Sequence, residues 1–231
     1  MSNIIWKGVN SDTITGLLIS ELPPITKPKM RTSSATIDGV DGDIISELGY
    51  EAYDKEVSIG LSYNYDINEV IKYFTGKGEL VLSNESDKYY KAQIVESVDY
   101  EKLINFKTAK VKFHCQPYKY LLNETPVEVA ITTETEVEVE NKGLEKSKPI
   151  ITLEGTGEIG LYVNGNQIFT YNFGEDTEVV IDSEKQDAYL GSILKNRQML
   201  GEFPILEAGE NTITWTGTIT NIKIEPKSRW I

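Results

Sequence analysis

The stretch "KEVSIGLSYNYDINEVIKYFTGKGELVLSN", residues 55–84, changes its hydrophobic period twice and thereby indicates the fold class. Its first part alternates polar and apolar side chains, the period of a strand with one buried face; the apolar positions are Val57, Ile59, Leu61, Tyr63 and Tyr65. Residues 66–74 then take helical spacing, with Asp66 placed to cap the first turn and Gly76 to end the last. "GELVLSN" predicts a second strand, so the order is strand, short helix, strand.

Strand patterns dominate the rest of the chain. "VEVAITTETEVEVE", residues 127–140, predicts one long strand or two joined strands, with glutamates along the outer face. "IGLYVNGNQIFTYNF" predicts a hairpin whose turn lies at Asn164 and Gly165. These patterns predict a mainly β protein: an N-terminal β domain with one short helix, followed by a C-terminal β-sandwich.

The 231 residues are enough for two domains of ordinary size, and the charge changes along the chain. Residues 1–124 contain 14 Lys and Arg and 18 Asp and Glu, whereas residues 125–231 contain 9 and 18. We therefore place a domain boundary near residues 123–126, which gives domains 1–124 and 125–231. The net charge of -13 argues against binding to nucleic acid, which requires clustered cations.

The single histidine and the single cysteine, His114 and Cys115, are neighbours in "VKFHCQPYKY". Consecutive side chains on a strand point to opposite faces of its sheet, so the two cannot exchange a proton or share a metal. We expect Cys115 in the core and His114 at the surface. Pro117 is expected to end regular strand pairing.

Other motifs match the sequence patterns of functional sites, but their structural context or spacing does not fit. "GTGEIG", residues 155–160, matches a dinucleotide-binding pattern, but "LYV" and a hairpin turn follow it, so no helix N-terminus is available for a phosphate and we expect a β turn. "DGVDGD", residues 38–43, fails the spacing of a calcium-binding loop and is expected to be a solvated loop. We predict no enzymatic activity, no cofactor and no metal, although a pair of glycosidase carboxylates cannot be placed from sequence.

Aromatic side chains in the second domain are candidates for stacking on sugar rings. Tyr162, Tyr171 and Trp215 are the three, because a β-sandwich with exposed aromatics can bind carbohydrate. The alternative is that these rings form ordinary core or cross-strand pairs.

Several stretches, taken in order, resemble one family. In residues 1–124 they are "TGLLISELPP", "IDGVDGD", the strand-helix-strand segment quoted above, "DKYYKAQI" and "VKFHCQPYKY". In residues 125–231 they are "LYVNGNQIF", "VVIDSE", "GEFPILEAGENTITW" and "IEPKSRW". Together they resemble the distal tail proteins of siphovirus-type bacteriophages of Gram-positive hosts, including those of prophages and tail-like bacteriocins. One position departs from the pattern of this family. Family members often carry an arginine in the acidic glycine loop, where this chain has Val40.

The resemblance implies a structural role at the virion tail tip, after assembly in the host cytoplasm. The N-terminal domain is expected to resemble tail-tube proteins and to form a hexameric ring, with Asp38, Gly39, Asp41 and Gly42 as a ring-contact loop. The implied partners are the tail-tube protein, the tail-associated hub protein and the tape-measure protein, with DNA only as passing cargo and no membrane. The C-terminal domain is expected to be a galectin-like or carbohydrate-module-like sandwich that in some members attaches a receptor-binding protein. The alternative function is recognition of host cell-wall glycans by this second domain.

Overall fold

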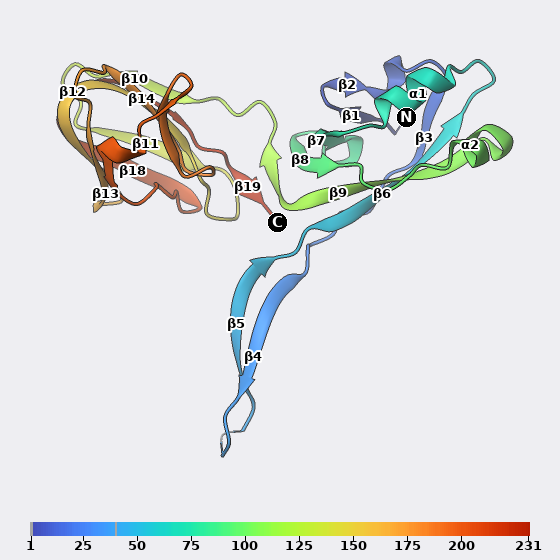
Figure 1. The fold of residues 1–231 in the computed structure, drawn as a ribbon, viewed down its shortest axis with the longest axis horizontal. Helices are drawn as coiled ribbons and strands as arrows, with labels where there is room; N and C mark the ends of the chain where they lie inside the picture. The colour runs from blue at the N-terminus through green and yellow to red at the C-terminus, as the bar shows by residue number, and fades with distance from the viewer. Residues whose placement is uncertain (1, 40) are drawn as a thin grey trace. The chain divides into compact units, whose positions relative to one another are not determined.

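The computed structural model describes residues 2–39 and 41–231 and shows a mainly β chain, as predicted (Figure 1). The chain divides into two compact units, the first ending at Leu122 and including Ile231, the second covering Asn123–Trp230. Each unit contains its own cluster of buried hydrophobic residues.

An antiparallel sheet with strand order β2-β1-β7-β8-β9-β6-β3 forms the first unit. Its strands are β1 Ile4–Trp6, β2 Val9–Asn10, β3 Leu17–Glu21, β6 Tyr53–Leu61, β7 Lys77–Leu82, β8 Lys88–Gln93 and β9 Thr108–Leu121. The strands β2 and β3 lie at the two edges of this order. Val57 and Ile59 point into the core, as their alternation predicts.

Two short helices belong to this unit. Helix α1, Ile67–Tyr73, confirms the predicted helix, and the Asp66 carboxylate accepts hydrogen bonds from the backbone N–H groups of Asn68 and Glu69. Helix α2, Tyr100–Phe106, was not predicted. Its sequence does carry a helical signal, because Tyr100, Leu103 and Ile104 lie at helical spacing and the Asp99 carboxylate accepts a hydrogen bond from the Lys102 N–H.

Two details of the strands differ from the prediction. Strand β9 continues past Pro117 to Leu121, because Pro117 lies where the pairing with β8 shifts register and no ladder N–H is needed. Strand β6 ends at Leu61, so Tyr63 lies beyond the sheet and is fully exposed rather than buried.

A separate two-stranded sheet is formed by β4, Met30–Thr36, and β5, Asp43–Tyr50 (Figure 1). We call residues 30–50 the arm. Every described residue from Arg31 to Leu48 is exposed, and β4 and β5 pair with each other alone among the described strands. The sequence analysis identified only the turn at the end of the arm.

The second unit contains one extended antiparallel sheet that encloses a core. Its strands are β10 Val127–Ala130, β11 Glu136–Asn141, β12 Ile150–Val163, β13 Asn166–Asn172, β14 Glu178–Asp182, β15 Asp187–Leu190, β16 Ile193–Leu194, β17 Met199–Gly201 and β18 Gly209–Glu225; the short β19 covers Arg229–Trp230. The main order is β10-β18-β12-β14-β15-β16, with β11 on β18, β13 on β12 and β17 on β13.

The long strands β12 and β18 pair with each other, and each also pairs with two shorter strands: β12 with β14 and then β13, and β18 with β11 and then β10. The register between β12 and β18 shifts within residues 155–160, the "GTGEIG" segment. This segment does not precede a helix, as predicted, but it is an irregular part of strand β12 and not the expected β turn. Opposite it, Gly217 has φ +86°, and a Cβ atom there would lie 2.3 Å from the Glu158 carbonyl oxygen. The 127–140 pattern is two strands, both paired with β18, and the hairpin at Asn164 and Gly165 joins β12 to β13 as predicted.

Candidate assembly surfaces

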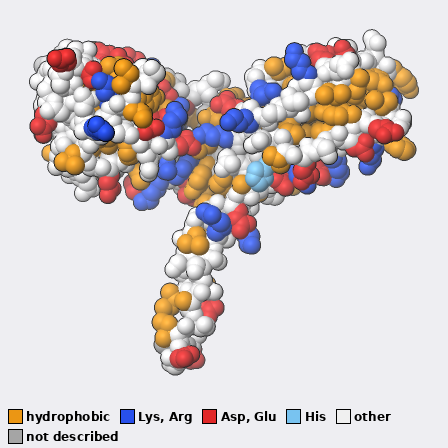
Figure 2. Space-filling view, viewed as in Figure 1, with side chains coloured by type: hydrophobic (Ala, Val, Ile, Leu, Met, Phe, Trp, Pro, Cys, Tyr) orange, Lys and Arg blue, Asp and Glu red, His pale blue; other side chains and the backbone are white. Residues whose placement is uncertain are grey.

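The arm exposes apolar side chains on both of its faces. Ile44 is 56% exposed and Ile45 64%, and neighbours on a strand point in opposite directions. Ile44 pairs with Ala35 and Ile45 with Ser34, so the side chains opposite each isoleucine are small. Figure 2 shows this apolar surface along the arm, with acidic side chains at its end. A hairpin of this kind buries its apolar groups only when something covers it from both sides.

The predicted ring-contact loop is the turn at the end of the arm. Gly39 and Gly42 have φ of +85° and +89°, the left-handed region that glycine permits. Asp38 and Asp41 are exposed beside them. Val40, where the family often has an arginine, lies outside the described residues. The solvated acidic loop is as predicted, whereas its contact with other subunits remains a prediction.

The base of the arm is held by contacts with the sheet of the first unit. The Tyr50 and Tyr118 rings meet edge to face with centroids 6.0 Å apart, and the Lys27 ammonium lies 5.4 Å from the Tyr50 ring centroid. The Glu51 N–H donates to the Lys29 carbonyl at 2.8 Å. These contacts hold the base of the arm against the sheet of the first unit.

A buried lysine holds the segment that leads into the arm. Lys55 is 2% exposed and donates from Nζ to the Pro24 carbonyl at 3.3 Å, while Asn84 donates to the Pro23 carbonyl at 3.0 Å. The Lys55 ammonium also lies 4.9 Å from the centroid of the Tyr90 ring. Burial lowers the pKa of Lys55, because the charged form loses water that these contacts replace only in part.

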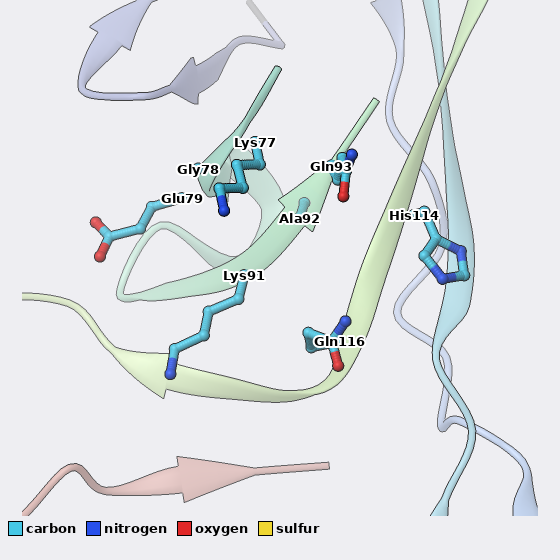
Figure 3. Close-up of a pocket in the computed structure, with 8 residues that line it drawn as sticks. All are labelled: Lys77, Gly78, Glu79, Lys91, Ala92, Gln93, His114 and Gln116. Carbon is cyan, nitrogen blue, oxygen red and sulfur yellow. The ribbon is translucent and has the colours of Figure 1, made fainter. Parts of the chain in front are cut away.

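A polar recess of about 420 Å³ lies against β7, β8 and β9 (Figure 3). It is lined by Lys77, Gly78, Glu79, Lys91, Ala92, Gln93, His114 and Gln116. His114 Nδ1 lies 2.8 Å from Asp54 Oδ1 on the solvent face, whereas Cys115 is fully buried. Burial raises the pKa of the Cys115 thiol to about 12, so it stays protonated. The separation of the two side chains is therefore as predicted.

A second recess, of about 260 Å³, lies beside helix α1, and we call it the α1 recess. Its apolar lining consists of Trp6, Val9, Ile14 and Tyr73. Its charged lining consists of Lys7, Glu69 and Lys72. The sequence offered no signal for it, because its walls come from segments about sixty residues apart in the chain.

The three predicted sugar-stacking aromatics do not form one platform. Tyr171 is fully buried, its ring lies edge to face with Phe173 at 5.1 Å and its hydroxyl donates to Gln198 Oε1 at 2.9 Å, so it cannot stack on a bound sugar. Trp215 pairs with core residue Leu161 and packs on the hydrophobic cluster. Tyr162, the next residue on β12, points to the opposite face and is half-buried.

Two further observations bear on the class of protein. Among residues 2–39 and 41–231, no three His, Cys, Asp or Glu side chains are grouped so that they could hold a metal ion. None of the helices in this described part is long and apolar enough to cross a membrane.

Comparison with solved structures identifies the fold. SPP1 Dit, described as a paradigm of the hub adsorption apparatus in phages that infect Gram-positive hosts, matches with a TM-score of 0.70 and 17% sequence identity over 97% of this chain and 98% of its own. The chain shares the fold of SPP1 Dit. A chain of the phage P2 baseplate in its activated, calcium-bound conformation matches with a TM-score of 0.51 and 10% identity over 97% of both chains. No family model and no curated protein sequence matches. The predicted resemblance to distal tail proteins is thus confirmed at the level of the fold.

Proposed function

We propose that this protein is a structural component of a phage tail tip or baseplate. In this proposal residues 1–124 form a hexameric ring that joins the tail tube to the tail-associated hub protein, near the tape-measure protein, and residues 125–231 form a peripheral sandwich. The role is structural rather than catalytic. The observation that carries the proposal is the fold similarity to SPP1 Dit, which covers 97% of this chain and so includes both units.

The arm supports assembly on physical grounds. An isolated two-stranded hairpin is marginally stable in water, and this one presents exposed Ile44, Ile45 and Leu48. Contact with neighbouring copies would cover these side chains. The first sheet also ends in two edge strands, β2 and β3, and a head-to-tail ring would give each edge the same neighbour at every subunit.

The charge of the chain suits a conduit for DNA. A surface that lets DNA pass must not hold its phosphates, and a protein of net charge -13 repels them. The cations Lys110 and Lys112 on the solvent face of β9 are paired with Glu56 and Glu96, so they do not form a free basic track.

Mass photometry of the purified protein, alone and with the tail-tube and hub proteins, tests the proposal. We expect a hexamer in at least one of these mixtures. Replacing Ile45 with Asp should abolish it, because a charge cannot be buried in the contact without a partner. The control Leu144→Asp alters a leucine of the second unit that is even more exposed than Ile45, and it should leave assembly intact. A strict monomer under every condition would refute the ring.

Recognition of cell-wall glycans by the second unit is a second candidate, and one local observation favours it. Gly160 lies two residues before Tyr162 on the same strand and has no side chain. A Cβ atom at Gly160 would lie 2.8 Å from Thr216 Oγ1 and 3.3 Å from Gln167 Nε2, so these two polar groups line the space beside Tyr162. An aromatic ring flanked by hydrogen-bonding groups is suited to a sugar. A glycan array with the intact protein tests this, and loss of a signal in Tyr162→Ala would support it. No signal for any glycan would leave the sandwich as a spacer or docking platform.

A further inference from the structure

The α1 recess combines an apolar floor with an open edge. Trp6 and Tyr73 are buried beneath it, and Ile14 completes the apolar wall. Val9 stands at its side on edge strand β2 and is 44% exposed. A chain that approaches this edge can therefore lie in the α1 recess against Val9 without displacing a strand.

The recess also contains a buried donor that has no acceptor. The Trp6 ring is fully buried, and its indole N–H has no hydrogen-bond partner among residues 2–39 and 41–231. Trp6 therefore contributes its apolar ring to the wall of the recess, whereas its N–H is itself covered and is not available to an occupant.

The charges around the recess favour an acidic occupant. Lys72 has no ion-pair or hydrogen-bond partner for its ammonium in the described part of the chain. Lys7 Nζ donates to the Thr75 carbonyl at 2.8 Å and retains two further N–H groups. Glu69, the single acid of the lining, already accepts the Thr15 N–H at 3.0 Å. The recess thus presents two cations against one engaged carboxylate.

We propose that the α1 recess of one subunit receives the arm of a neighbouring copy of this chain. The arm offers branched apolar side chains, Ile44 and Ile45, between Asp43 and Glu47, and it carries four carboxylates and one arginine. Apolar groups flanked by acids match an apolar floor flanked by lysines. The arm is exposed throughout its own chain, so the occupant comes from a second copy. This inference rests on the proposed ring and names the contact that closes it.

The other two described recesses of the first unit fit the arm less well. The polar recess has cations, but Ala92 is the single apolar side chain in its lining. The third recess has an apolar part made of Leu22, Pro23 and Pro24, but its lining carries three carboxylates, from Glu21, Asp54 and Glu56, against two lysines. Of these lysines, Lys55 is buried and Lys110 is paired with Glu56, so the acids of the arm would be repelled. The α1 recess is the one of the three that combines both properties.

Cysteine trapping with full-length protein tests the contact. A Val9→Cys protein is mixed with an Ile44→Cys or Ile45→Cys protein under mild oxidation, and we expect disulfide-linked dimers in at least one mixture. The control partner is Phe106→Cys, because Phe106 is 73% exposed on α2 and should not meet the arm. The native Cys115 is fully buried and does not compete. Cross-linking no greater than the control, in a preparation that forms hexamers, would overturn the inference while leaving the ring intact.

A charge exchange gives a second, independent readout. Lys72→Glu and Glu47→Lys should each raise the protein concentration needed for half-assembly by roughly fivefold, the effect of losing one exposed ion pair. The double variant should recover most of this loss. Equal assembly by all three proteins would overturn the proposed pairing. If the wild-type protein forms no oligomer with its tail partners, the proposed ring and this inference both fail.

Discussion

At the scale of the residue, the first unit contains a buried ion pair. The Glu85 carboxylate accepts hydrogen bonds from Lys119 and from the Tyr90 hydroxyl, and both charged side chains are less than a tenth exposed. Burial alone would raise the pKa of Glu85, but these hydrogen bonds and the charges of Lys119 and Lys55 outweigh it and lower the pKa. The ionised pair is therefore part of the stable folded state.

Replacing Glu85 with Gln should destabilise the protein by about 3 kcal/mol at pH 7, because Lys119 would remain buried without its counter-ion. Since the folded-state pKa of Glu85 lies below its unfolded value, its stabilisation is complete above the unfolded pKa and is lost as pH falls through the folded one. Part of the acid-induced loss of stability should thus disappear in the variant. Urea unfolding at pH 7 and pH 4 measures both effects, and Glu56→Gln, from an exposed pair, should change stability by less than about 1 kcal/mol.

Cys115 provides a second prediction at this scale. Because its thiol is buried and its pKa is raised to about 12, the native protein should not react with a thiol reagent at pH 8, and unfolding in urea should expose one reactive thiol. Ellman's reagent measures this directly. Rapid modification of the folded protein would show that β9 opens at that position.

At the scale of the element, the pairing of β12 with β18 in the second unit depends on particular glycines where the register shifts. Gly217 has φ +86°, and a Cβ atom there would also lie against the Glu158 carbonyl. Gly209 has nearly the same backbone angle, φ +89°, but no atom lies within 4 Å of the place where its Cβ would be. The two glycines therefore separate backbone strain from steric overlap.

Gly217→Ala should destabilise the protein by about 3 kcal/mol, since strain and overlap add, whereas Gly209→Ala should cost about 1 kcal/mol from strain alone. Denaturant unfolding measures the difference. Equal losses at the two positions would mean that β12 moves aside at the bend.

The arm shows what local sequence can and cannot predict about an element. Its turn was recognisable because Gly39 and Gly42 bracket an acidic loop. Its strands were not, because "MRTSSAT" contains no alternating apolar side chains and "DIISELGY" puts Ile44 and Ile45 on opposite faces. Period analysis finds elements with one buried face, and the arm has none within its own chain.

At the scale of the whole molecule, the two units have separate cores. Residues 123–231, produced alone, should fold and unfold in one cooperative transition, because the buried residues from Val137 to Ile224 form one cluster within this range. Circular dichroism and urea unfolding of the fragment test this. A fragment without a cooperative transition would show that the second unit needs the first.

Assembly gives the other prediction for the whole molecule. In the monomer trypsin should cut rapidly after Arg31 in the exposed arm, and in the hexamer this cut should slow at least tenfold, because the arm would be covered. Timed digestion followed by mass spectrometry compares the two states. Equal cleavage rates would show that the arm stays outside the subunit contacts.

Local sequence patterns are sufficient to predict the fold class, the capped helix α1, the hairpin turn at Asn164 and Gly165 and the opposite placement of His114 and Cys115. Each of these follows from the local period or from the conformational preference of one residue. Three features became visible only in the folded chain: the burial of Tyr171, the continuation of β9 past Pro117 and the exposed apolar groups on both faces of the arm. These depend on which distant segments pack against each other, and the α1 recess likewise exists only because β1 and β2 lie against α1.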